Sequence, residues 1–224
     1  MKKYPILSAQ FSSTTDKIFF SSIFNNYYSF DMNKNALFCL PIKTKNKHRE
    51  MLFSKLSPNG KMICFFFNTG ELDIYSTQTH LPIATMAANN IVSDACFDAS
   101  GDTLFTCSSK SSAVHLWDMR NQKSFAFLQD DNFYGNTSLA LSPKEKLLSL
   151  GNSSGALNLY SIANPVAEFE NKNIIKPTKT LSNLTYSCEN IIFSPKTNLM
   201  FYSSSQGENS AKLVILTLIT KTNE

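Results

Sequence analysis

Cysteine and histidine are scarce in this 224-residue sequence, which contains five cysteines and three histidines. No two cysteines are spaced as Cys-x-x-Cys, so the usual zinc-ligand pattern is missing and we expect neither a metal nor a cofactor. The cysteine count is odd, and Cys64 and Cys96 lie within apolar stretches. This usage favours reduced, buried thiols in an intracellular compartment over a disulfide framework.

Long apolar segments and catalytic motifs are also missing. Runs such as "MICFFF" are far too short to cross a membrane, and the N-terminus lacks the apolar core of a signal peptide. No phosphate-cradling loop of the type GxxxxGK occurs, and no nucleophile is arranged in sequence with a histidine. We therefore expect no membrane association, no small-molecule substrate and no enzymatic activity, although a triad assembled in space from distant residues stays open.

The residues that are abundant indicate a globular β protein. Apolar residues make up 42% of the chain and charged residues 17%, which is typical of a folded domain. The 18 phenylalanines and 8 tyrosines favour strands, and frequent Asn and Ser suit turns. The net charge of +4 is a mild bias, compatible with an acidic or nucleic-acid partner without identifying one.

One pattern repeats five times along the chain. Each copy has an apolar anchor, a turn and an apolar strand, and the anchors lie about 41 to 52 residues apart: Phe11, Leu56, Phe97, Leu141 and Phe193. This period is typical of propeller blades. The five repeats span approximately residues 4–48, 49–88, 89–130, 131–183 and 184–224 of a single propeller domain covering 1–224.

A second strand recurs in phase, about twenty residues after each anchor. It alternates apolar and polar residues and ends in a bulky side chain: Phe30, Tyr75, Trp117, Tyr160 or Ile215. The single tryptophan, Trp117, therefore occupies one position of a repeat. Asp118 after it, and Asp31 in the first repeat, are placed to hold the tight turn that follows the strand.

Turn residues recur at fixed phases of the repeat. Pro58 and Gly60 in "SPNG" suit a type I turn, and Pro143 and Pro195 stand at the same place in later repeats. Gly70 and Gly155 fall where a hairpin needs positive φ. Since no stretch has sustained helical periodicity, we predict an all-β propeller of about five radially stacked blades. A final outer strand is missing after Leu218, so the propeller is expected to be incomplete or partial.

The blade pattern resembles that of WD-repeat propellers, most closely in residues 57–86 and 98–128. The Gly-His dipeptide of many such blades is absent, so the His–Asp network that it supports is not predicted. A narrower resemblance is to the C-terminal propeller of WD-repeat subunit eighteen of the small-subunit processome. It is carried by "SPNGK", "VHLWDMR", residues 136–162 and, most specifically, "PTKTLSNLT" from Pro177 to Thr185.

The narrower resemblance implies a function. That family accompanies the U3 small nucleolar RNA in ribosome biogenesis, which implies a non-catalytic scaffold in the nucleus and nucleolus. It would support pre-ribosomal RNA processing and 18S rRNA maturation. The implied partners are other WD-repeat processome subunits and, less directly, pre-ribosomal RNA and small nucleolar RNA. The alternative is a generic WD-repeat adaptor of another complex, such as a ubiquitin ligase or a trafficking coat.

Two basic segments are candidate contacts for RNA or a protein partner. The first joins the first two repeats and contains Lys43, Lys45, Lys47, His48 and Arg49; the second contains Lys172, Lys176 and Lys179. Either segment could contact phosphates, or be an ordinary solvated connector. The first lacks the interleaved aromatic side chains that would stack on bases. Asp130 and Asp131, the most conspicuous carboxylate pair, are expected to lie in a solvated turn.

Overall fold

A computed structural model describes residues 5–12, 14–42, 49–130, 134–143, 147–162, 176–207 and 210–216. All regular elements in these ranges are β-strands, and they form five antiparallel sheets in chain order. The chain divides into two compact units: 1–92 with 97–104 and 117–125, and 93–96 with 105–116 and 126–224. The third sheet contributes residues to both units, and the domain prediction of one propeller over 1–224 stays a prediction.

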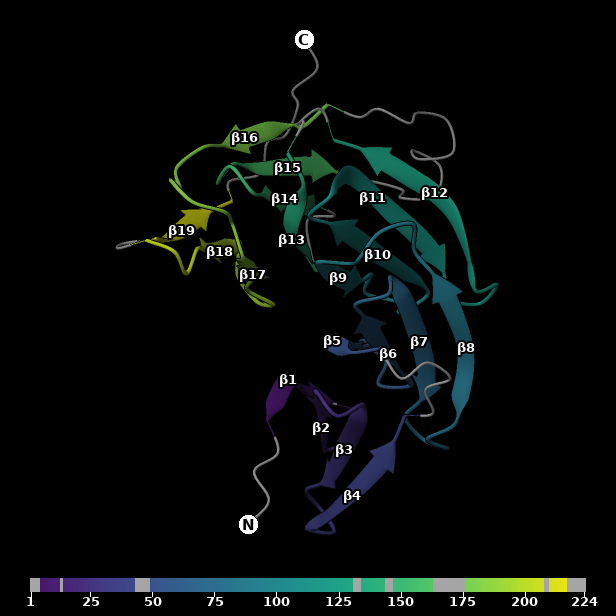
Figure 1. The fold of residues 1–224 in the computed structure, drawn as a ribbon. Helices are drawn as coiled ribbons and strands as arrows, with labels where there is room; N and C mark the ends of the chain where they lie inside the picture. Colours follow the sequence, from purple (N-terminus) through teal and green to yellow (C-terminus); the bar gives the residue numbers. More distant parts are fainter. Residues whose placement is uncertain are drawn as a thin grey trace. The chain divides into compact units, whose positions relative to one another are not determined.

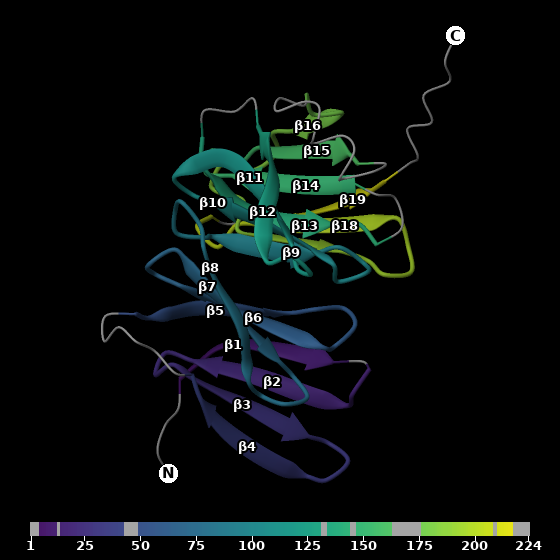
Figure 2. The same cartoon turned by 90° about the vertical axis from the view of Figure 1, so that its right-hand side faces the viewer.

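The first two sheets lie in the first unit, and Figures 1 and 2 show the strands of each sheet side by side in chain order. The first sheet contains β1 (Ile6–Ser12), β2 (Lys17–Ser22), β3 (Asn26–Asp31) and β4 (Ala36–Pro41). The second contains β5 (Met51–Leu56), β6 (Met62–Phe67), β7 (Glu71–Ser76) and β8 (Pro82–Ala87).

The third sheet follows the same plan, with β9 (Asp94–Phe97), β10 (Thr103–Ser108), β11 (Ser111–Asp118) and β12 (Lys123–Gln129). The fourth contains β13 (Asn136–Leu141), β14 (Leu147–Asn152), β15 (Leu157–Ser161) and β16 (Lys179–Leu181). The described part of the fifth contains β17 (Asn190–Phe193), β18 (Leu199–Ser203) and β19 (Ala211–Ile215). Each sheet lies within one predicted repeat; the expected loss of the last outer strand concerns residues outside the described ranges.

Glycine and aspartate set the turns that space these strands. The N–H of Gly60 donates to the Ser57 carbonyl at 2.9 Å, which closes the turn that contains Pro58, and Gly60 has φ +68. Gly70 and Gly155 have φ +80 and +84 in the hairpins before β7 and β15, a backbone conformation that glycine adopts without strain. After β3, Asp31 accepts the N–H groups of Asn33 and Lys34.

Neighbouring sheets of one unit pack face to face through apolar side chains. In the first unit, Phe19 and Tyr27 of the first sheet are fully buried against Ile63, Phe65 and Tyr75 of the second. In the second unit, Leu157 and Leu159 share a core with Met200 and Tyr202 of the fifth sheet. Consecutive strand residues point to opposite faces, so alternation along each strand produces these cores. This stacking of blades confirms the predicted all-β propeller class.

Candidate functional site

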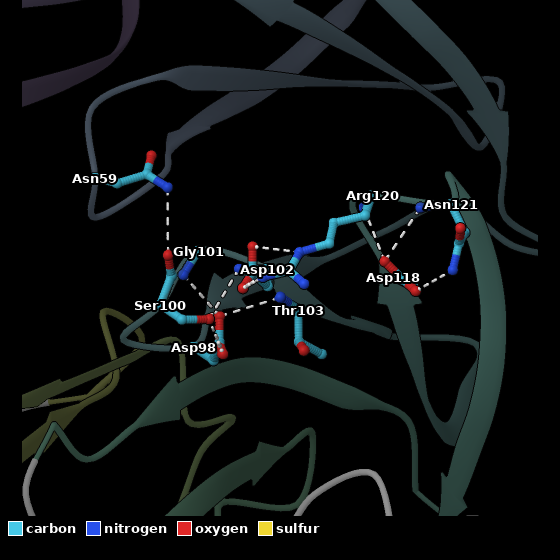
Figure 3. Close-up of polar contacts among 9 residues, drawn as sticks. All are labelled: Asn59, Asp98, Ser100, Gly101, Asp102, Thr103, Asp118, Arg120 and Asn121. Carbon is cyan, nitrogen blue, oxygen red and sulfur yellow. Dashed lines mark hydrogen bonds and ion pairs between the residues drawn. The ribbon is translucent and has the colours of Figure 1, made fainter.

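Two polar turns of the third sheet form a cluster on the first compact unit (Figure 3). In the turn between β9 and β10, Asp98 Oδ1 accepts the N–H groups of Gly101 at 2.9 Å and Thr103 at 3.0 Å. The Ser100 hydroxyl donates to Asp98 Oδ2 at 2.6 Å, and Gly101 has φ +80. The sequence "DASGD" forms a turn because Asp and Ser side chains hydrogen-bond to nearby groups, which gives backbone N–H groups partners outside a strand ladder.

The second turn follows the single tryptophan. Asp118 Oδ1 accepts the N–H groups of Arg120 at 2.8 Å and Asn121 at 3.2 Å, and Asn121 Nδ2 donates to Oδ2 at 2.6 Å. The Asn121 backbone N–H is the largest influence that lowers the pKa of Asp118, with smaller contributions from the Arg120 N–H and the Asn121 side chain. The lowered pKa favours the ionised form of Asp118, whose carboxylate accepts three hydrogen bonds from its own turn.

An ion pair joins the two turns. Arg120 Nε and Nη2 lie 3.2 and 2.5 Å from the two carboxylate oxygens of Asp102, and this pairing raises the pKa of Arg120. The Arg120 side chain is 74% exposed, so the pair orients a cation at the surface more than it stabilises the fold. Asn59 of the preceding sheet donates to the Ser100 carbonyl at 3.2 Å, which ties the cluster to the second sheet.

A hollow of about 450 Å³ lies beside this cluster and is lined by Asp118, Asn121, Lys123, Ser124 and Phe125. Lys123 and Ser124 are exposed at the start of β12, and Phe125 is half-buried. A cation, a hydroxyl and an aromatic ring at one surface suit contact with a protein side chain. Within the described ranges, no three His, Cys, Asp or Glu side chains gather in a group that could hold a metal ion.

Of the predicted contact residues, Arg49, Lys176 and Lys179 lie within the described ranges. Lys43, Lys45, Lys47, His48 and Lys172 lie outside the described residues. Lys176 and Lys179 are exposed, and Lys179 pairs with Leu159 at the edge of the fourth sheet. The Thr178 N–H donates to the Leu159 carbonyl at 2.7 Å, which fixes the segment that carries both lysines. Their contact with RNA or a partner stays a prediction.

Arg49 differs from the exposed cation that the sequence predicts. It is only 5% exposed, and its Nη1 lies 2.7 Å from Asp73 Oδ2 while its Nε lies 2.8 Å from Glu71 Oε2. Its guanidinium carbon also lies 3.6 Å from the centre of the Phe67 ring. Because its guanidinium is buried and paired with Asp73 and Glu71 inside the first unit, Arg49 is not placed to contact a phosphate at the surface.

Asp130 also differs from the expected solvated turn. It is 3% exposed, and its Oδ1 accepts hydrogen bonds from Asn158 Nδ2 at 2.9 Å and from the Tyr160 hydroxyl. Asp131 lies outside the described residues. The signal that could have revealed this site is Asn158 itself, a polar residue in the middle of the apolar strand "LNLYS".

The second and fourth sheets share a buried polar arrangement that sequence reasoning missed. Asp73 pairs with Thr85 across β7 and β8, and Thr85 Oγ1 donates to Asp73 Oδ1 at 2.7 Å. Asn158 pairs with Thr180 across β15 and β16, and Thr180 Oγ1 donates to Asn158 Oδ1 at 2.7 Å. Each central residue stands three positions after its hairpin glycine. A polar residue three positions after a hairpin glycine is therefore a sequence signal for this buried polar pair.

The two histidines within the described residues each lie beside an aromatic side chain. His115 is half-buried and its ring lies 6.4 Å from that of Phe127, and burial lowers its pKa. His80 Nδ1 lies 2.9 Å from the hydroxyl of the fully buried Tyr27. Burial is the main influence that lowers the pKa of His80, followed by the charge of Lys17. Burial thus favours the neutral form of both rings.

Within the described residues, stacked antiparallel blades with polar turns at their ends define a β-propeller with five blades. A chain in the crystal structure of the mitotic checkpoint complex has the same fold, with a TM-score of 0.70 and 17% identity over 91% of this chain and 58% of that chain. Over 96% of its length, the chain is 26% identical to the U3 small nucleolar RNA-associated protein 18 homolog of Arabidopsis thaliana.

Two further curated relatives have the same kind of name. The U3 small nucleolar RNA-associated protein 18 homolog of Drosophila melanogaster is 25% identical over 95% of the chain. The probable U3 small nucleolar RNA-associated protein 18 of Schizosaccharomyces pombe is 23% identical over 71% of the chain. The chain spans 38%, 40% and 30% of the lengths of the three relatives. No protein-family model matches it.

Proposed function

We propose that this chain is a non-catalytic scaffold of the U3 small nucleolar ribonucleoprotein and the small-subunit processome, in the nucleolus. The observation that carries the proposal is the similarity to U3 small nucleolar RNA-associated protein 18 homologs over 96% and 95% of the chain. The propeller supplies the physical means, since stacked blades hold the turns of one unit in fixed relative positions. Such a surface binds other proteins without doing chemistry.

The side chains of the site agree with a binding role. The carboxylates of Asp98 and Asp118 accept hydrogen bonds from their own turns, and that of Asp102 is paired with Arg120. General acid–base catalysis needs a group with an available proton site and a pKa near the working pH. The second turn and the start of β12 instead present Arg120, Lys123 and Phe125, and Arg and aromatic side chains are enriched at protein interfaces.

The proposed partners are other WD-repeat subunits of the processome. Pre-ribosomal RNA and small nucleolar RNA would be bound mainly through those proteins. The exposed Lys176 and Lys179 are the described residues that we propose for any direct phosphate contact, because ammonium groups on a fixed segment can neutralise phosphates. The processome assignment implies a role in pre-ribosomal RNA processing and in maturation of 18S rRNA.

Depletion of the protein from cells that express it tests the proposal. We expect 18S rRNA to fall relative to the large-subunit rRNA, with its longer precursors accumulating, because the scaffold would be needed to process the small-subunit precursor. Re-expression of the wild-type protein is the control and should restore the ratio. An unchanged ratio after complete depletion would contradict the proposal and favour a generic WD-repeat adaptor of another complex.

A further inference from the structure

The turn after the third strand has the same backbone feature in the first three sheets. Asn35, His80 and Gln122 each stand four positions after the last residue of that strand, and their φ angles are +48°, +58° and +57°. In the second sheet the His80 N–H donates to the Ser76 carbonyl at 2.9 Å, and in the third the Gln122 N–H donates to the Asp118 carbonyl at 2.8 Å. The fold therefore sets the path of the backbone at this turn.

The side chain that follows this turn differs from sheet to sheet. The residue after the positive-φ position is Ala36 in the first sheet, Leu81 in the second and Lys123 in the third. Because the turn forms with any of these side chains, the fold does not explain the lysine. Lys123 is exposed, and no ion pair among the described residues contains it.

Lys123 lines the hollow of about 450 Å³ together with the two residues that follow it. Ser124 is exposed and offers a hydroxyl group, and Phe125 is half-buried and offers an apolar ring. A carboxylate can accept hydrogen bonds from an ammonium group and from a hydroxyl at the same time. The hollow therefore combines two donors for a carboxylate with an apolar surface for the methylene groups that carry it.

Asp118 lines the same hollow, but its charge is compensated within its own turn (Figure 3). The carboxylate accepts the N–H groups of Arg120 and Asn121 and the Asn121 side-chain amide. Lys123 is thus the charged group of this hollow that has no counter-charge among the described residues. A negatively charged side chain would balance it, whereas a basic side chain would meet like charges at Lys123 and Arg120.

We propose that this hollow binds the side chain of a Glu or Asp from a protein partner. Its carboxylate accepts hydrogen bonds from the Lys123 ammonium and the Ser124 hydroxyl, and its methylene groups pack on Phe125. The inference rests on the proposed scaffold role and names the partner chemistry at one surface of that scaffold. A nucleic-acid strand suits the surface less, because its successive phosphates would meet the carboxylates of Asp102 and Asp118.

Carbodiimide cross-linking tests the contact in the complex that the tagged, full chain recovers from nuclear extract. The reagent joins a lysine amine to a carboxylate that touches it, and mass spectrometry identifies both residues. We expect Lys123 to be linked to a Glu or Asp of another protein. Lys110, which is also exposed and lies in a hairpin turn, is the matched control and should not be linked to that protein.

Charge variants test whether the contact holds the partner. Lys123→Glu should lower recovery of the linked protein about tenfold, because two carboxylates would then face each other. Lys110→Glu should leave the recovery unchanged. Lys123→Arg should retain the protein but lose the cross-link, because a guanidinium keeps the charge and is not coupled by the reagent.

Two results for the protein contact overturn the proposal: a Lys123→Glu variant that recovers every protein at the wild-type level, and a Lys123 that is linked to no other protein. Ultraviolet cross-linking of RNA to residues 118–125 would assign the hollow to nucleic acid and overturn it as well. If the complex lacks U3 RNA but Lys123 is linked to an acidic residue of another protein, the processome assignment fails and this inference stands. Recovery of the processome without that link has the opposite meaning.

Discussion

Arg49 shows that a residue at the end of a basic segment can be buried by pairing with distant carboxylates. Its guanidinium contacts two carboxylates and the Phe67 ring, and the residue is 5% exposed. Replacing both partners of a buried ion pair with apolar residues often costs little stability. Removing only one partner is costly, because the other charge stays buried without a counter-charge. If Arg49 were removed, the buried charge left without its partner would be that of Asp73, which is 3% exposed.

Arg49→Met should therefore lower the free energy of unfolding by roughly 3 kcal/mol, because Asp73 would lose its cation and stay buried. Urea unfolding of the variant and the wild type at pH 7 measures this difference. Arg120→Met is the control, since Arg120 is exposed and its ion pair is screened by water; it should leave stability little changed. Equal effects of the two substitutions would contradict the structural role of Arg49.

Asp118 contributes stability only while its carboxylate is ionised. Its pKa in the folded chain is lowered by the Asn121 and Arg120 N–H groups, so its contribution is complete above its ordinary pKa of about 3.9 and is lost as pH falls through the lower folded value. Asp118→Ala should cost about 0.5 to 1 kcal/mol at pH 7, reduced by solvent screening.

Urea midpoints of the wild type and the Asp118→Ala variant, measured from pH 7 down to pH 2.5, follow this contribution. The difference between the two proteins should be constant from pH 7 to about pH 5 and should shrink toward zero below about pH 4. A difference that is the same at pH 7 and pH 2.5 would show that the carboxylate charge does not hold this turn.

At the level of elements, the hairpin glycines differ in how tightly they are enclosed. Gly70 and Gly155 both have φ near +80, but an added Cβ at Gly155 would lie 2.5 Å from the Leu184 carbonyl oxygen, against 3.1 Å from that of Ala88 at Gly70. Gly155→Ala should thus cost well over 1 kcal/mol, and Gly70→Ala only about 1 kcal/mol.

Thermal unfolding of the two alanine variants tests this order directly. The Gly155→Ala midpoint should fall further than that of Gly70→Ala, because the added Cβ would lie 2.5 Å from a backbone oxygen at Gly155 and no closer than 3.1 Å to one at Gly70. Gly70→Ala thus serves as the matched control for the shared loss of positive-φ freedom. A larger loss at Gly70 would mean that the hairpin before β15 relaxes without strain.

Much of the element pattern could be predicted from the sequence, because it depends on local signals. The phase of Trp117, the glycines and the "SPNG" turn depend on neighbouring residues, and the five sheets lie within the five repeats. The surroundings of Arg49 and Asp130 depend on residues 24 and 30 positions away, at Asp73 and Tyr160. Such long-range pairing cannot be derived from charge and spacing within one segment.

At the scale of the whole molecule, the proposed place of the chain in the ribonucleoprotein predicts how its retention there depends on salt concentration. If proteins hold the chain in the ribonucleoprotein, high salt should release little of it, whereas direct phosphate contacts would be lost. Lys176→Glu with Lys179→Glu should leave the recovered proteins unchanged and reduce RNA recovery, mainly at low salt. The same exchange at the exposed Lys61 and Lys110 is the control for charge alone. Identical RNA recovery from both double variants would remove Lys176 and Lys179 as specific contacts.

The most direct test of the nucleolar scaffold is purification of the tagged, full chain from nuclear extract, with the bound RNA sequenced and the bound proteins identified. The account predicts U3 small nucleolar RNA and pre-ribosomal RNA together with other WD-repeat subunits of the processome. The proteins should be retained at high salt. Recovery of an unrelated protein complex, without U3 RNA or ribosomal precursor at either salt concentration, would contradict it.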